Sequence, residues 1–474
     1  MAEEKKQKKE SELIKEKLGR NEQSAWERLS EGELKKVWPL AEEYKEFLSG
    51  YKTEREIVTH IKRTVEKHGF QPMEKSGLKP GNKAWISNKE KNIALIIAGK
   101  KGLEHGLRVI VSHIDALRLD WKVNPFYEDG GLVMINLHYY GGMKKYHWVN
   151  VPLSLHGIVF LKDGKKLEIN LGEKEEEPVF VISDLLPHVG GKAFAEKKAV
   201  DLVPGESLDA IAASIPLNEK EASNKIKLRL LKLLHEKYGL VEEDFFSAEL
   251  QLVPATKPRD IGFDNSLIGA YGHDDRASSF AGLKAVLDVA GTPEFTSIML
   301  FMDKEEIGST GATGSENLFL ESVVSDLCKK MNCSKTEKQV LADSFFLSAD
   351  VTSALDPKYR EFFDPTNVNF VGFGVSIERE TGYGGKYDGS AASAEFLSFL
   401  RRLFNENNVV WQSGEIGKVD EGGGGTVAKY FAKYGCEIAD VGAPVLAMHS
   451  PFEVLSKVDL YESYKAYRVF FESK

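Results

Sequence analysis

GLRVIVSHIDA, residues 106–116, sets the fold class of this chain. Its apolar run is continuous, which predicts a strand buried on both faces of a sheet. Ahead of it, KAWISN (83–88) and KNIALIIAG (91–99) predict two further strands joined by a polar turn. Apolar residues three and four apart between Trp26 and His68 predict helices that precede these strands. Helices followed by buried strands indicate an α/β sandwich.

The chain changes character after residue 117. Short alternating strands and turns follow up to about 182, then one amphipathic helix over 220–240 and the strand-like segment AELQLVPA (248–255). This pattern predicts a β-rich inserted domain over 117–254. Because α/β alternation returns from about 260, the predicted α/β domain has two parts. These are 1–116, with a charged tail over 1–20, and 255–474.

Length and charge narrow the function classes. A chain of 474 residues predicts two or three domains. Its net charge of −9 argues against a general nucleic-acid binder, which would show a basic surface. No stretch approaches the roughly 20 apolar residues of a membrane span, so we expect no membrane partner.

The N-terminus and the cysteines predict a cytoplasmic protein. The opening MAEEKKQKKE lacks the apolar core of a signal peptide, so export is not expected. Three cysteines are too few for a disulfide framework and are expected to be free thiols in a reducing compartment.

Metal-ligand residues follow several of the apolar strands. Five segments place them at a strand end or in the next loop: VSHIDA (111–116), GHDDRAS (272–278), FMDKEEIGS (301–309), LSADVT (347–352) and AMHSPFE (447–453). Ligands at the carboxyl ends of parallel strands can converge over one edge of a sheet.

Each segment also has an ordinary interpretation. His113 and Asp115 are two apart on a strand and face one side, so Asp115 could accept the second ring N–H of a metal-bound His113. An ordinary strand end explains them equally well. Asp274 or Asp275 could bridge two metals, or cap the helix that follows.

The other candidate residues can also be interpreted either as part of a metal site or as ordinary structural residues. Glu305 and Glu306 stand together after an apolar strand, which is costly unless cations neutralise them. One could bind a metal while the other acts as general base. Asp350 could be a ligand or a cap, and His449 a ligand or a structural histidine. Together the segments supply three ligands per ion, one of them shared, and a base, which predicts a two-metal hydrolase.

The sequence resembles the aspartyl aminopeptidase family of dinuclear zinc metallopeptidases. The stretches that carry the resemblance are SHIDALRLD, HYYGGMKKYHWVNVPLSLHG, GHDDRASSFAG, DKEEIGSTGATGSEN, LSADVTSALDP and GKVDEGGGGTVAKYFAKYG with LAMHSPFEV. The resemblance implies a metallopeptidase α/β sandwich, with a mixed sheet flanked by helices and a β-rich inserted domain. It also implies a homododecamer with the active sites facing an inner chamber.

The resemblance implies a role for each site residue. His113 and Asp350 would bind one metal, Glu306 and His449 the other, and Asp274, four residues before Ser278, would bridge both, with Glu305 as general base and Asp115 orienting His113. A cis bond between Asp274 and Asp275 is also expected. His156 would stabilise the oxyanion in a neighbouring subunit, whereas without the resemblance it would be a buried strand histidine.

Two alignments place the expected specificity residue at different positions. Family members that prefer N-terminal Asp or Glu carry a basic residue in the first specificity pocket. In GVSIERETGYGGKYDG (374–389) that residue becomes Glu378 by one alignment and Arg379 by another, with Lys386 nearby. The glycine run EGGGGT (421–426) lacks the Lys-Ser/Thr of a phosphate loop and predicts a tight turn near the metal site.

The sequence therefore predicts a two-metal aminopeptidase acting on peptides, with a preference for acidic N-terminal residues as one option. The cofactor is expected to be zinc, with cobalt and manganese as alternatives, because oxygen and nitrogen ligands accept all three. A related dinuclear metal amidase or deacylase is the enzymatic alternative. A non-catalytic assembly shell is the alternative of another class.

Overall fold

A central sheet of nine strands organises the α/β part of the molecule. The computed structural model describes residues 9–19 and 23–474, so the predicted charged tail lies partly outside the described residues. Across the sheet the order is β1 (Gln71–Pro72), β2 (Lys83–Asn88), β3 (Asn92–Ile97), β13 (Ser297–Met302), β4 (Arg108–His113), β14 (Phe345–Ser348), β20 (Glu437–Gly442), β16 (Val375–Glu378) and β18 (Trp411–Gln412). The four central strands β13, β4, β14 and β20 are parallel. Their carboxyl ends therefore share one edge.

Helices cover both faces of this sheet. Alternate residues of β4 point to opposite faces: Ile110 packs in one apolar cluster, and Val109 and Val111 pack in another. The first cluster includes α2 (Ala25–Arg28), α3 (Glu31–Gly50), α4 (Glu54–Lys67), α7 (His273–Leu287), α10 (Ala394–Glu406) and α12 (Lys457–Phe471). The second includes α8 (Phe319–Lys330), α9 (Glu337–Ala342) and α11 (Ala428–Ala432). Burial on both faces explains the continuous apolar run of the strand.

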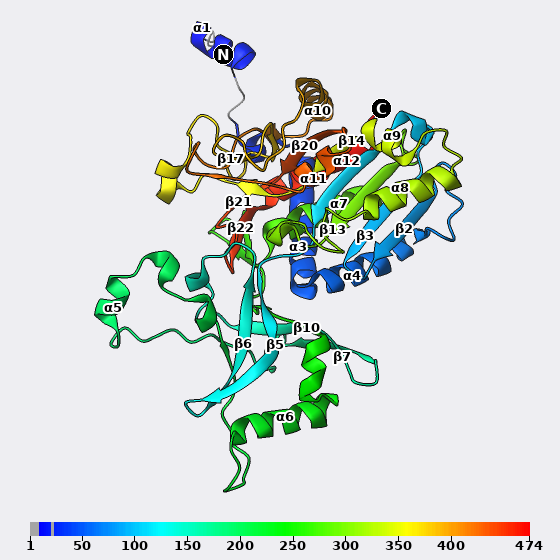
Figure 1. Cartoon of the computed structure of the whole chain (residues 1–474). Helices are drawn as coiled ribbons and strands as arrows, with labels where there is room; N and C mark the ends of the chain where they lie inside the picture. Colours follow the sequence, from blue (N-terminus) through cyan, green and yellow to red (C-terminus); the bar gives the residue numbers. More distant parts are fainter. Residues whose placement is uncertain (1–8, 20–22) are drawn as a thin grey trace.

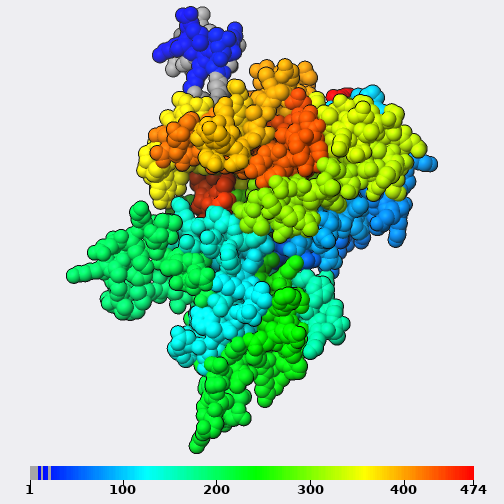
Figure 2. All heavy atoms as spheres, in the orientation of Figure 1, coloured from blue at the N-terminus to red at the C-terminus, as the bar shows by residue number. Residues whose placement is uncertain are grey.

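The segment from β5 to β10 forms a second, six-stranded sheet. Its order is β8 (Lys166–Leu171), β7 (Leu153–Phe160), β10 (Ala248–Pro254), β5 (Arg118–Asp129), β6 (Leu132–Tyr140) and β9 (Ala210–Ala213), all antiparallel. Two helices, α5 (Gly191–Ala195) and α6 (Lys225–Tyr238), belong to the same segment. It has its own apolar cluster and projects from the α/β body (Figures 1 and 2).

A third sheet joins the two larger parts and carries a loop of the candidate site. Its order is β11 (Arg259–Ile261), β12 (Leu267–Ala270), β22 (Glu453–Ser456), β21 (Pro444–Leu446) and β15 (Thr352–Ser353). A two-stranded ribbon, β17 (Gly382–Tyr383) with β19 (Gly423–Gly424), and α1 (Glu10–Leu18) complete the elements. None of the helices in the described ranges combines the length and apolar character needed to cross a membrane.

Candidate metal centre

The predicted ligands come together at the carboxyl edge of the central parallel strands. His113 is the last residue of β4, and Asp350 follows β14 by two residues. Glu305 and Glu306 open a short 3₁₀ turn just after β13. Since β13, β4 and β14 are neighbours in the sheet, these side chains approach from three adjacent strand ends.

The other two ligands arrive from outside the central sheet. Asp274 stands at the start of α7, where its backbone is not helical (φ −82°, ψ 110°), and its peptide bond to Asp275 is cis, as expected. His449 lies in the loop between β21 and β22 with a positive φ of 66°. A non-glycine residue rarely adopts that conformation except where surrounding contacts enforce it.

The ligand atoms form two groups that share Asp274. One group is His113, Asp274 and Asp350; the other is Asp274, Glu306 and His449; within each group the ligand atoms lie within 4.8 Å of one another. Asp274 Oδ1 is 3.0 Å from Nε2 of His113, whereas its Oδ2 is 3.2 Å from Nε2 of His449. The two oxygens of Asp274 therefore face different ligand groups. This is the arrangement expected of a carboxylate that bridges two metal ions.

The acids of this centre are crowded and largely desolvated. Burial, reinforced by Asp350 and Asp274, raises the pKa of Glu305 to about 8. Burial and the nearby Asp274 raise the pKa of Glu306 well above its usual range, and Glu306 Oε1 is buried without a hydrogen-bond partner. A buried carboxylate oxygen with no partner is costly. The donor set therefore fits divalent cations, which would supply the missing partner.

The histidines respond to the same charges. Burial opposes a charge on His449, but Asp274 and Glu306 outweigh it and raise its pKa to about 11. The side chain of His449 is 37% exposed, against 1% for His113 and 10% for Asp350. The centre therefore opens to solvent beside His449.

Asp115 holds several parts of the centre together. Nδ1 of His113 lies 3.1 Å from the backbone carbonyl of Asp115 and 3.3 Å from its Oδ1, so both groups orient the ring. The same carboxylate accepts the backbone N–H groups of Glu305 (3.1 Å) and Glu306 (3.3 Å). Asp115 thus links the end of β4 to the turn that carries both glutamates.

Sequence reasoning missed Glu453. Its buried carboxylate accepts the backbone N–H of Asp274 at 3.1 Å and of His449 at 2.8 Å. It therefore fixes the main chain of the shared ligand and of a second ligand at once. The available signal was its position in AMHSPFE, four residues after His449.

The end of β6 was also missed as part of the centre. Tyr140 donates its hydroxyl to Asp115 Oδ2 at 2.8 Å, and the carbonyl of Gly142 accepts Nδ1–H of His449 at 2.8 Å. The second contact leaves Nε2 of His449 facing Asp274 and Glu306. The HYYGG segment (138–142) thus joins the second sheet to the metal centre.

His156 lies outside this centre in the single chain. It is buried on β7, with Nδ1 2.8 Å from Glu56 and Nε2 3.0 Å from Glu173. Burial opposes its charge, but both carboxylates raise its pKa. Both ring nitrogens therefore already have partners, as expected of a buried strand histidine.

The three candidate specificity residues lie in two different pockets. Glu378 is 4% exposed and lines a pocket with Glu380, Lys386 and Glu415. Arg379 lines a different pocket on the other side of β16, because neighbouring residues of a strand point to opposite faces. The glycine run contributes Gly422 and Gly424 to the pocket of Glu378.

Comparisons with known proteins agree with this geometry. The sequence profile of the M18 family, described as aminopeptidase I zinc metalloprotease, matches residues 47–471. A Borrelia garinii protein named "Probable M18 family aminopeptidase 1" is 45% identical over 95% of this chain and 99% of its own. The crystal structure of an M18 aminopeptidase from Thermotoga maritima has a TM-score of 0.92 and 41% identity, covering 96% of this chain and 100% of that one. A structure described as the mApe1 dodecamer of S. cerevisiae has a TM-score of 0.73 at 22% identity, covers 91% of this chain and 96% of that one, and shares the fold.

Proposed function

The chain belongs to the M18 family of aminopeptidase I zinc metalloproteases, and we propose that two ligand groups sharing Asp274 would hold two zinc ions, with Glu305 as the general base of the enzyme. Membership makes it a hydrolase, a zinc-dependent aminopeptidase with a mixed α/β fold. The observation that carries the proposal is the split of the Asp274 carboxylate between His113 and His449.

The proposed ligands follow the two groups of the centre. His113 and Asp350 would hold one ion, Glu306 and His449 would hold the other, and Asp274 would serve both. The unpartnered Oε1 of Glu306 supports this assignment, since a cation would complete its surroundings. A set of nitrogen and oxygen ligands also accepts cobalt and manganese.

Glu305 is the group proposed to move the proton. Bound metal ions supply Lewis acidity, acidifying a water molecule and polarising the scissile carbonyl. Glu305 takes a proton from that water and delivers it to the leaving amine, which restores the carboxylate for the next turnover. Its backbone N–H is held by Asp115, which keeps the carboxyl group at the edge of the ligand cluster.

A subunit assembly and a role for His156 also belong to the proposal. We expect a homo-oligomer, and specifically the dodecamer described for the yeast protein of the same fold. His156 would then stabilise the oxyanion in a neighbour's site. To do so it would have to exchange one of its present partners, Glu56 or Glu173, for the substrate.

The sequence left two alternatives, a metal amidase and a non-catalytic shell, which an activity assay distinguishes from the aminopeptidase. The amidase would use much the same ligands, so substrate profiling separates it from the aminopeptidase. The shell predicts a missing ligand or base, whereas all five proposed ligands and Glu305 are present.

One assay tests the proposal. Purified enzyme is offered aminoacyl-nitroanilides with acidic, basic and neutral residues and the corresponding N-acetylated compounds. Each is assayed with chelator and after adding back zinc, cobalt or manganese. Chelator-sensitive release from free-amino substrates alone is the expected result. Release from acetylated substrates would favour the amidase, and no release with metal bound would favour the shell.

A further inference from the structure

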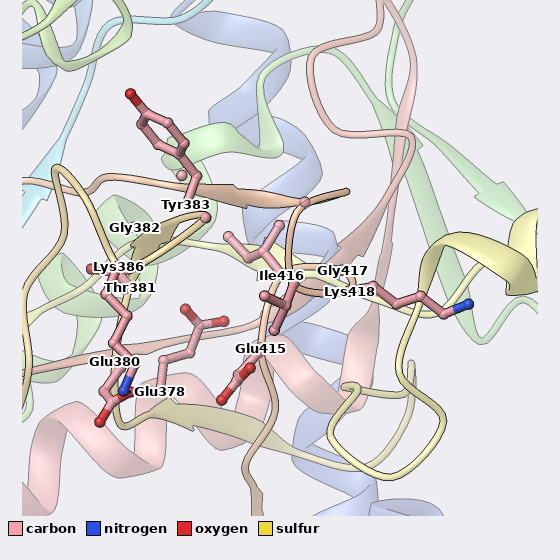
Figure 3. A pocket seen from close by; sticks show the side chains of 14 residues that line it. Glu378, Glu380, Thr381, Gly382, Tyr383, Lys386, Glu415, Ile416, Gly417 and Lys418 are labelled. Atoms are coloured by element: carbon pink, nitrogen blue, oxygen red, sulfur yellow. The ribbon is translucent and has the colours of Figure 1, made fainter.

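A pocket opens at the end of β16 in the central sheet, two strands from β14, the strand that precedes Asp350. Its walls are two segments, 378–386 and 415–424, and its cavity volume is about 80 Å³ (Figure 3). Glu378 ends β16, and it pairs in register with Asp440 of β20, which pairs in turn with Ser348 of β14. Asp350, a proposed metal ligand, lies two residues beyond Ser348. The pocket is therefore two strands away from the metal centre.

Glu378 places a carboxylate in this pocket without a cation to balance it. Glu378 is only 4% exposed, and its carboxylate accepts a hydrogen bond from the hydroxyl of Thr352. Within the described residues no salt bridge joins Glu378 to a lysine, arginine or histidine. Glu415 lies near enough to reinforce its negative charge, and Figure 3 shows both side chains between the two walls.

The basic residues of the neighbourhood are engaged elsewhere. Lys386 and Arg379 both pair with Glu380, and their side chains are 65% and 76% exposed. Lys418 lines the pocket but points away from Glu378 in Figure 3. Neither Lys386 nor Lys418 therefore neutralises the carboxylate of Glu378.

The sheet behind the pocket adds further negative charge. Burial raises the pKa of Asp440 to about 6, and Asp440 in turn disfavours the ionised form of Glu378. Burial also raises the pKa of Glu378 itself to about 8. A buried carboxylate in such surroundings is stabilised when a cation enters.

We propose that this pocket binds the basic side chain of a substrate's N-terminal lysine or arginine, with its cationic end facing Glu378 and Glu415. The aliphatic stem of such a side chain would lie against Ile416 and Val419, which also line the pocket. An acidic N-terminal side chain would meet two carboxylates and is excluded by repulsion. The inference rests on the proposed aminopeptidase function and names its substrate class.

Matched substrates test the inference on the unmodified enzyme. Zinc-loaded enzyme is compared on lysyl-, norleucyl- and glutamyl-nitroanilide, because norleucine has the same length as lysine without the charge. We expect kcat/KM for lysine to exceed that for norleucine at least about tenfold, and glutamate to be the poorest substrate. Release from norleucine with no advantage for lysine would overturn the pocket assignment alone. No release from any substrate, with metal bound, would instead overturn the proposed function.

Two variants test whether Glu378 causes the preference for lysine over norleucine. Glu378→Gln keeps the shape and the acceptor for Thr352, and it should lower the lysine-to-norleucine ratio at least about tenfold. Arg401→Gln, in the pocket on the other side of β16, should leave that ratio unchanged. An unchanged ratio in Glu378→Gln, or an equal fall in Arg401→Gln, contradicts the inference. If Glu378→Gln unfolds, as judged by its thermal transition, the ratio in the unmodified enzyme still decides.

Discussion

The buried carboxylate of Asp115 contacts four groups of the candidate metal centre. It contacts the ring of His113, the backbone of Glu305 and Glu306, and the hydroxyl of Tyr140. Its pKa is lowered, because His113 and Arg118 outweigh the burial that opposes its charge. A charged Asp115 therefore fixes the positions of His113 and Glu305 together.

Glu305→Gln should abolish most turnover while leaving the ligand groups intact. Removing a general base lowers kcat by roughly 10²–10⁴-fold, since the amide cannot accept the proton. Metal content, measured by elemental analysis, should match the unmodified enzyme. His449→Ala is the contrasting variant and should lose one metal. Full activity in Glu305→Gln would require a different base.

His60 on α4 predicts a pH effect on stability. Burial, with smaller contributions from Lys67 and Arg63, lowers its pKa from 6.5 to about 4. Its ring stacks on Tyr51 at 4.1 Å between centroids. Between these pH values the folded protein binds fewer protons at His60 than the unfolded chain does. The free energy of unfolding that neutral His60 contributes is therefore lost as pH falls from 6.5 to 4.

His60→Phe keeps an aromatic ring and removes the titration. Measured by denaturant unfolding at fixed zinc, its free energy of unfolding should gain on that of the unmodified protein as pH falls from 6.5 to 4. Parallel pH curves would show that His60 is not held neutral.

At the scale of elements, the end of β6 couples the second sheet to the metal centre. Tyr140 and Gly142 contact Asp115 and His449, respectively. Gly141 between them has a φ of 82°, and an added Cβ would lie 2.1 Å from Leu117. The turn is therefore built for a close approach that only glycine permits.

Tyr140→Phe should weaken catalysis more than folding. The variant removes one hydrogen bond to Asp115, so we expect kcat to fall about tenfold while KM changes little. Tyr139→Phe is the matched control, since its neighbouring ring is 38% exposed and it should retain full activity. Equal kinetics in the two variants would show that the contact from β6 does not position the centre.

At the scale of the whole molecule, metal removal should lower stability. Ions that bind the folded state alone stabilise it, by about 2.7 kcal/mol at a hundredfold excess over Kd. We expect chelator to lower the thermal midpoint and zinc to restore it. Asp274→Asn weakens both proposed sites, so its midpoint should respond little. A chelator response in Asp274→Asn equal to that of the unmodified protein would place the metals elsewhere.

The proposed assembly predicts the mass of the particle. Twelve chains of 52.8 kDa give roughly 630 kDa, which light scattering coupled to gel filtration would measure. A monomeric mass at micromolar protein with full activity would contradict both the dodecamer and the contribution of His156 to a neighbouring site.

The sequence by itself determined the α/β fold and the placement of the candidate ligands after apolar strands. Strand periodicity and the position of a residue after an apolar run are local properties, so His113, Glu306 and Asp350 could be placed at strand ends in advance. The predicted inserted domain and its boundaries stay a prediction, although the second sheet spans Arg118 to Pro254.

Only the tertiary structure decided which groups meet. Gly142 and His449 are 307 residues apart in the chain, and no local pattern predicts that contact. Likewise, the geometry places Glu378 in the pocket of the 378–386 and 415–424 segments and Arg379 in a different one, a choice that two alignments left open. These choices depend on the packing of distant segments and on the register of β16, where a shift of one residue would reverse the face on which each side chain lies.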